Sequence, residues 1–241
     1  MWNILNSYFS TLKMVIGSGL LAKSFANFLN NDSFVVFCSG VSNSTCTNIL
    51  EFERECNLLE KSVTENEDKI LIYFSTCSIY DDSLKNSLYI QHKLKLENFI
   101  QKKCHKFYIF RLSNVVGLTS NKYTILNYFY NCIEHEISFD LWKSSFRNII
   151  DVDDVNSIVT YIIQHKLFQN EITNIANNNS SSVLEIVSAI EKYLSKKGNY
   201  ELIEKGKEFK INTTKIQPIL EQLQLSFNSN YIDTLLNKYY K

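Results

Sequence analysis

The chain has 241 residues, 45% of them hydrophobic and 21% charged, a composition typical of a globular protein with a sizeable core. Lys and Arg total 25, as do Asp and Glu, so the charge balance gives no reason to expect nucleic acid or an acidic membrane as a partner. No apolar run approaches the roughly 20 residues of a membrane span. Residues 1–12 lack the basic start and long apolar stretch of a signal peptide, and we expect a dispensable N-terminal extension there.

Apolar runs alternate with helical patterns along the chain, as in α/β proteins with a mainly parallel sheet. The expected strands are 13–17, 34–38, 69–75 and 107–112. The expected helices are 20–29, 47–61, 87–102, 122–134, 154–165, 183–195 and 230–239. In the 183–195 helix, Ser182 and Glu185 predict a capping box ahead of an apolar stripe.

The cysteines and histidines give no sign of a metal site. The six cysteines include no C-x-x-C pair and lie mostly in apolar runs, which predicts reduced thiols and a cytoplasmic protein. The four histidines are scattered, and we interpret them as ordinary surface or core residues. We therefore expect no metal.

A glycine-rich turn follows the first expected strand. Gly17, Gly19 and Ala22 match G-x-G-x-x-A, a turn that lets the backbone approach a pyrophosphate at a helix N-terminus. Taken alone, the pattern also suits a tight strand-to-helix turn without a ligand. The strand after the following helix normally ends in an acid that holds the adenosine ribose. Here that strand, 34–38, runs into Ser39 and Gly40, so the acid is missing.

A second set of polar residues follows the strand at 69–75. Thr76 comes just after Ser75 at the strand end, and Tyr89 and Lys93 stand four residues apart, which places both on one helix face. An ammonium near a tyrosine favours the phenolate, so the phenol can exchange a proton with a ligand. Tyr193 and Lys197 repeat the spacing without a preceding strand end, and we expect that tyrosine to cover the core.

These motifs, in this order, resemble the extended branch of the short-chain dehydrogenase/reductase superfamily, the NAD-dependent nucleotide-sugar epimerases, dehydratases and ketoreductases. The resemblance runs from about residue 14 to the C-terminus. Besides the turn and "YIQHK", it rests on "FVVFCSGVSN", "IYFSTCSIY", "FRLSNVVG", "RNIIDVDDV" and "NIANNNSSSVLEIV". It implies a Rossmann-like, doubly wound, mostly parallel sheet in residues 13–120. Residues 121–241 would complete this core and form a small substrate-binding lobe.

The resemblance also implies roles for individual residues. Tyr89 would be the acid/base, Thr76 would orient the substrate oxygen, and Lys93 would hold the nicotinamide ribose. The other cofactor-binding residues would be Gly17, Ser18, Gly19, Leu20, Leu21, Ser39 and Gly40. Asn114 would lie at the substrate mouth, and Arg147 would grip a substrate diphosphate. The alternative for Arg147 is a salt bridge to Asp151, Asp153 or Asp154, of which Asp153 and Asp154 suit helix capping.

Two departures from the superfamily narrow the expected function. If 34–40 is its fourth strand, the second and third strands are absent, and the adenosine side of the cofactor site is reduced. Cys77 and Ser78 stand where the 4,6-dehydratases carry an Asp-Glu pair, which argues against dehydration. We expect an NAD- or NADP-dependent ketoreductase or epimerase acting on a nucleotide sugar for surface polysaccharide, with a homodimer as an open option. The alternative is a non-catalytic nucleotide-sugar-binding or regulatory protein.

Overall fold

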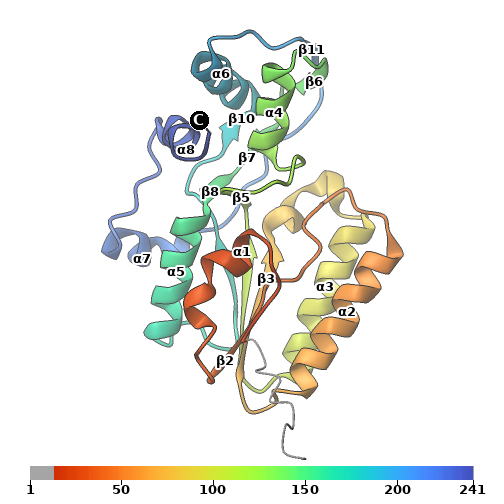
Figure 1. The fold of residues 1–241 in the computed structure, drawn as a ribbon, viewed down its shortest axis with the longest axis vertical. Helices are drawn as coiled ribbons and strands as arrows, with labels where there is room; N and C mark the ends of the chain where they lie inside the picture. Colours follow the sequence, from red (N-terminus) through yellow and green to blue (C-terminus); the bar gives the residue numbers. More distant parts are fainter. Residues whose placement is uncertain (1–13, 241) are drawn as a thin grey trace, which may run out of the picture.

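The computed structural model describes residues 14–240, so the expected extension at 1–12 lies outside the described residues. A five-stranded sheet with the order β1-β2-β3-β4-β9 forms the centre of the molecule (Figure 1). Its strands are β1 (Val15–Ile16), β2 (Phe34–Phe37), β3 (Ile70–Thr76), β4 (Phe107–Leu112) and β9 (Ile172–Ile175). Every neighbouring pair is parallel. This arrangement confirms the Rossmann-like α/β fold.

The two strands expected to be missing are absent from the described part of the chain. Helix α1 (Leu20–Ser24) and a 3-10 turn at Ala26–Phe28 lead directly into β2, which pairs with β1 in the register Val15 to Val36. Between residues 14 and 69, β1 and β2 are the only strands, so β1 forms one edge of the sheet.

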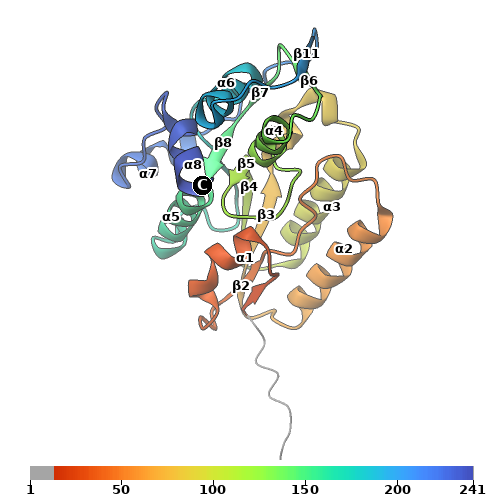
Figure 2. The same cartoon turned by 45° about the horizontal axis from the view of Figure 1, so that its top comes forward.

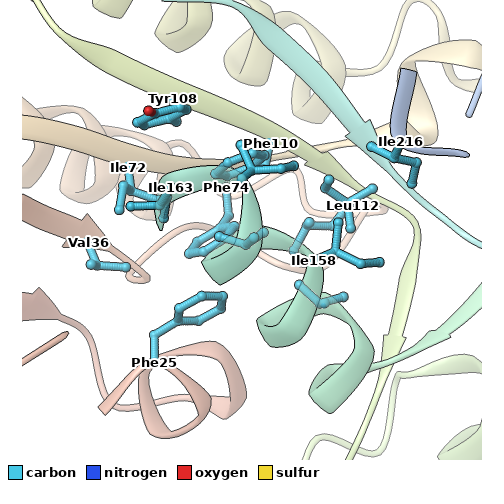
Figure 3. Packing of buried hydrophobic residues seen from close by; sticks show 14 of the residues in the cluster. Phe25, Val36, Ile72, Phe74, Tyr108, Phe110, Leu112, Ile158, Ile163 and Ile216 are labelled. Atoms are coloured by element: carbon cyan, nitrogen blue, oxygen red, sulfur yellow. The ribbon is translucent and has the colours of Figure 1, made fainter. Parts of the chain in front are cut away.

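Helices cover both faces of the sheet (Figure 1). Helices α2 (Ile49–Thr64) and α3 (Leu88–Lys103) lie on one face, and α1 and α5 (Val152–Gln164) lie on the other. Successive strand side chains point to opposite faces. In β4, therefore, Tyr108 and Phe110 join the cluster under α5 (Figure 3), whereas Ile109 packs beneath α2 and α3. Burial on both faces explains why β3 and β4 read as continuous apolar runs.

A smaller lobe stands beyond the carboxyl ends of the strands and has its own apolar core (Figures 1 and 2). It contains α4 (Ile125–Glu134), α6 (Val183–Leu194), α8 (Tyr231–Tyr239) and the parallel pair β6 (Phe139–Trp142) and β11 (Tyr200–Ile203). The capping box of Ser182 and Glu185 is present at the start of α6. Tyr193 packs against this core, as expected. Two short strand pairs lie between the lobe and the sheet. They are β5 (Asn114–Val116) with β8 (Ile149–Asp151), and β7 (Phe146–Arg147) with β10 (Ser181–Ser182). Helix α7 (Gln217–Gln222) packs beside α5.

The expected helix at 20–29 is wrong in its second half. Helix α1 ends at Ser24, and the Phe28 N–H bonds to the Phe25 carbonyl in a 3-10 turn. Three residues make one turn of a 3-10 helix, so Phe25 and Phe28 are both buried on the sheet. Within residues 14–240, no helix is both long and apolar enough to cross a membrane.

Candidate functional site

A cavity of about 550 Å³ lies at the carboxyl ends of β1 to β4, on the side of the sheet that faces the lobe. This is where open parallel sheets bind their ligands. Most of the predicted site residues line it, namely Gly19, Leu20, Leu21, Gly40, Thr76, Tyr89, Lys93, Asn114 and Arg147. Gly17, Ser18 and Ser39 do not line it. The lobe contributes residues that the sequence did not indicate, among them Tyr123, Tyr128 and Phe209.

The glycine turn after β1 shapes one wall of the cavity. Gly17 has φ of +129°, a backbone conformation that favours glycine, and a Cβ there would lie 2.7 Å from the Cys38 carbonyl oxygen. Gly17 therefore lets β1 turn tightly against the end of β2. At Gly19 the space around a Cβ is open to 4 Å, so the backbone of the turn is accessible from the cavity.

Thr76 and Tyr89 present hydroxyl groups at the cavity. The Thr76 Oγ1 accepts the Ser78 N–H at 3.0 Å and caps the 3-10 turn Cys77–Tyr80. Tyr89 lies in the first turn of α3, whose N-cap Ser87 accepts the Ile90 N–H. Tyr89 is 5% exposed, and its hydroxyl has no hydrogen-bond partner within residues 14–240. Within these residues the hydroxyl oxygen is unpaired but not fully buried. Because Tyr89 lines the cavity, this oxygen is accessible from it.

Lys93 lies one turn after Tyr89 and is held by a buried carboxylate. Its Nζ donates to Glu55 Oε1 at 2.8 Å and to the Tyr73 hydroxyl at 3.3 Å. The ammonium is also 5.8 Å from the centre of the Tyr89 ring. The Lys93 side chain is 3% exposed and that of Glu55 is fully buried. The cation on the predicted Tyr-Lys face is therefore already paired within the protein.

Glu55 is the main site residue that sequence reasoning missed. Its Oε2 accepts the Val41 N–H at 2.7 Å and contacts His92 Nε2 at 3.0 Å, and the Tyr73 hydroxyl donates to Oε1 at 2.8 Å. Burial alone would raise the pKa of this carboxyl, but Lys93, His92 and the Val41 N–H together lower it to about 2. The available signal was position, because Glu55 lies on the buried stripe of α2 with Phe52 and Leu59.

A second buried carboxylate supports the neighbouring strand ends. Glu97, two turns after Tyr89 on α3, accepts from Ser75 Oγ at 2.6 Å and from Arg111 Nε at 2.9 Å. The Arg111 NH1 donates in turn to the Tyr80 hydroxyl at 3.2 Å. This network fixes the end of β3 against β4, and in the described residues it shares no hydrogen bond with Lys93.

Arg147 enters the cavity from β7 on the lobe side. One N–H of its guanidinium donates to the Phe146 carbonyl at 2.8 Å. Within the described chain it makes no other hydrogen bond and no ion pair, so the expected alternative of a salt bridge to Asp151, Asp153 or Asp154 is absent there. Burial lowers the pKa of Arg147, and nearby Asp81 opposes that shift.

The capping expectation for α5 needs a correction. The N-cap is Asp151, which accepts the Asp153 N–H at 2.9 Å, while Asp153 and Asp154 lie in the first turn. Lys238 of α8 pairs with Asp151 and Asp153, both at 2.7 Å. These contacts occupy two of the three carboxylates expected as alternatives for Arg147, and the third, Asp154, accepts a hydrogen bond from the Tyr231 hydroxyl.

Asn114 and Ser39 have protein partners. The Asn114 amide donates to the Asn148 carbonyl at 2.8 Å, and the neighbouring Ser113 hydroxyl is buried without a partner among residues 14–240. Ser39 is engaged by Arg54, whose guanidinium donates to the Ser39 hydroxyl at 3.0 Å and to its carbonyl at 3.1 Å. Arg54 is a further residue near the turn that the sequence did not point to. The described residues contain no cluster of possible metal ligands.

Solved structures of nucleotide-sugar enzymes match this fold over most of the chain. A UDP-glucose 4-epimerase from Thermus thermophilus, complexed with NAD, matches with a TM-score of 0.65 at 14% identity, covering 90% of this chain and 80% of that one. The chain has the fold of the extended short-chain dehydrogenases/reductases. The resemblance seen in the sequence is thus confirmed at the level of the fold.

Two further structures extend the likeness to this fold. The UDP-N-acetylglucosamine 4-epimerase from Bacillus cereus matches with a TM-score of 0.63 at 20% identity, covering 91% of this chain and 80% of that one. RMD from Pseudomonas aeruginosa, complexed with NADPH, matches with a TM-score of 0.67 at 11% identity, covering 94% of this chain and 99% of that one. No protein-family model matches the sequence, and no curated protein does.

Proposed function

We propose that this protein is an NAD(P)-dependent reductase or epimerase that acts on a nucleotide-activated sugar, with Tyr89 as its acid/base. The observation that carries the proposal is one shared cavity: Thr76, Tyr89 and Lys93 line it together with the glycine turn and Arg147. Enzymes with the same fold have been solved with NAD or NADPH. Reduction is the simpler of the two reactions, because it needs only a hydride and one proton.

The residues around the cavity fit a nicotinamide dinucleotide on its reactive side. The open backbone at Gly19 would receive the pyrophosphate, and Leu20, Leu21 and Gly40 would border the cofactor. When bound, the cofactor supplies or accepts the hydride. On the adenosine side, residues 14–240 provide no strand beyond the edge strand β1 to carry the usual acid, so we propose a weakened grip there.

The protein's own groups would bind, orient and protonate the substrate. The Tyr89 hydroxyl, unpaired within the described residues, is placed to give a proton to a substrate oxygen in the cavity or to take one from it. Thr76 would hold that oxygen, since its own hydrogen is free while Oγ1 accepts from Ser78. Arg147 would bind the diphosphate, because a planar guanidinium suits two phosphate oxygens at once. Asn114 and Ser113 lie beside this path.

The setting we propose is a reducing cytoplasm and a surface-polysaccharide pathway. All six cysteines are unpaired in the structure, in accord with reduced thiols. A homodimer is part of the same proposal. Within residues 14–240, β1 leaves one edge of the sheet unpaired, and an unpaired edge favours association with another chain.

The test begins with cofactor binding. NADH and NADPH are titrated into the purified protein by calorimetry, and ketosugar nucleotides are then assayed for oxidation of whichever cofactor binds. We expect binding in the micromolar to millimolar range and turnover that depends on Tyr89. Failure of both cofactors to bind at millimolar concentration would contradict the catalytic proposal.

A second function, a nucleotide-sugar-binding or regulatory protein, is favoured by two observations. Lys93 is paired with Glu55, and β1 is an edge strand within residues 14–240, so we infer that both ends of the proposed cofactor site bind a dinucleotide less tightly. The two functions are separated by the same titrations: a pure binding protein binds a nucleotide sugar through Arg147 and binds neither nicotinamide cofactor.

A further inference from the structure

The Lys93 ammonium has few donors left for a ligand. An ammonium has three N–H groups, and the contacts with Glu55 and Tyr73 account for two of them. Its positive charge is balanced by a carboxylate that is fully buried. Although Lys93 lines the cavity, only one of its N–H groups is left for a ligand in the described structure, and its charge is already neutralised by Glu55.

Glu55 is built into the protein so that it holds Lys93 firmly. Its two oxygens take four contacts, from Lys93 and Tyr73 on Oε1 and from Val41 and His92 on Oε2. A carboxylate offers about four lone-pair positions, so Glu55 has no unused capacity. Three separate segments therefore fix its position: α3, β3 and the loop after β2.

The missing side chain of Gly40 leaves room for the ion pair of Lys93 and Glu55. A Cβ added at Gly40 would lie 2.8 Å from Lys93 Nζ and 3.0 Å from Glu55 Oε1. The ammonium and the carboxylate thus occupy the space that a side chain at Gly40 would need. This places the ion pair behind the loop, on the side of α2 and α3.

We propose that Glu55 is a positioning residue that holds the Lys93 ammonium behind Gly40 and thereby limits the grip of Lys93 on a ligand's ribose hydroxyls. This inference rests on the proposed function, because the ribose in question belongs to the nicotinamide cofactor. It makes an unusual prediction: replacing Glu55 should strengthen cofactor binding. A residue with a merely structural role would weaken binding or leave it unchanged.

The first measurement needs no ligand. In protein labelled with ¹⁵N-lysine, the protons of a buried, hydrogen-bonded ammonium exchange slowly enough to give a resonance, and Lys93→Met identifies the signal of Lys93. Glu55→Gln keeps the shape of the side chain but removes its charge, and it brings an amide N–H against the Val41 N–H or His92. We expect exchange of the Lys93 protons to accelerate at least tenfold in this variant. Unchanged exchange would overturn the inference.

The matched control is Glu97→Gln. Glu97 is also a buried carboxylate paired with a cation, Arg111, and it lies on the same helix as Lys93 without a hydrogen bond or ion pair to it in the described structure. Any general loosening of the core that follows from removing a buried charge appears in this control too. Exchange that accelerates equally in both variants would also overturn the inference.

The second measurement is NADH binding by calorimetry. If Lys93 regains a charge-assisted hydrogen bond to the ribose, the Kd of NADH should fall by about tenfold, which is the lower limit for such a bond. We expect this gain in Glu55→Gln, no gain in Glu97→Gln, and loss of the gain in the double variant Glu55→Gln with Lys93→Met. An unchanged or higher Kd in Glu55→Gln would overturn the inference.

The two measurements also separate this inference from the proposed function. If wild type and every variant bind neither NADH nor NADPH, the proposed cofactor is wrong. The inference is then decided by proton exchange alone: selective acceleration in Glu55→Gln upholds Glu55 as the residue that holds Lys93, and its absence refutes that role.

Discussion

Removing the Arg147 guanidinium is the sharpest test of the substrate side of the cavity. Of its five N–H groups, one is bonded to the Phe146 carbonyl, which leaves four for a ligand in the described structure. Diphosphate oxygens would accept two of them in a forked arrangement. A hydrogen bond to a charged group contributes about 1.5–3 kcal/mol, and we take this range for the whole truncation because water replaces part of the loss. Arg147→Ala should therefore raise the Kd of a nucleotide sugar by about 10- to 150-fold.

The assay is calorimetry with UDP-glucose, dTDP-glucose and GDP-mannose, followed by NADH on the same protein. NADH binding should change less than about twofold, because Arg147 enters from the lobe and not from the glycine turn. Arg54→Ala is the control for nucleotide-sugar binding, since Arg54 is an exposed arginine outside the cavity lining and bonds to Ser39, just after β2. An equal loss of affinity for both ligands, or a nucleotide-sugar Kd that stays within twofold, would refute the role assigned to Arg147.

Three further predictions follow from the site and the lobe. Tyr89→Phe should lower turnover of a ketosugar nucleotide by about 10²–10⁴-fold, the usual contribution of a positioned proton donor, while thermal unfolding stays unchanged; full activity would exclude Tyr89 as the acid. Since the pKa of Glu55 is lowered to about 2 from 4.5, its stabilisation is present above pH 4.5 and is lost as the pH falls through about 2. At about 1.36 kcal/mol per pKa unit, this stabilisation is about 3 kcal/mol. The free energy of urea unfolding should therefore depend less steeply on pH between 5 and 3 in Glu55→Gln than in wild type. Equal slopes would contradict the burial of this charge. Tyr231→Phe should lower the free energy of unfolding by about 1–3 kcal/mol, because the hydroxyl accepts the Asp151 N–H and donates to Asp154; the exposed Tyr123→Phe should not, and equal effects of the two variants on urea denaturation would argue against this contact.

The fold could be predicted wherever a local pattern repeats over a whole element. The continuous apolar runs of β3 and β4 and the stripe of α6 gave bounds within a residue or two of those observed. The missing strands were predicted because 34–40 resembles the fourth strand of the superfamily and follows the first helix directly. Strands such as β7 and β10 have two residues each, which is too short for any periodicity to appear. They form because the lobe brings them together.

The sequence was enough to single out residues that line one cavity, but it did not reveal their partners inside the protein. Thr76, Tyr89 and Arg147 belong to motifs with fixed spacing, and all three line the cavity. Glu55 lies 38 residues before Lys93, and no local rule links the two. Their pairing depends on how α2 and α3 pack side by side on the sheet. A charged residue on a buried helix stripe is the one clue that the sequence held.

The edge position of β1 has a topological consequence. In the usual doubly wound order the first strand lies inside the sheet, with the second and third strands beyond it. Here β1 to β4 are spatial neighbours in the same order as in the chain, so the described sheet is shorter at one end. An insertion at residues 30–33 that extends the sheet past β1 would therefore need two strands, a helix between them and a second crossover helix that returns the chain to the start of β2. Such a chimera would test the proposal that the cofactor site lacks a wall on the adenosine side.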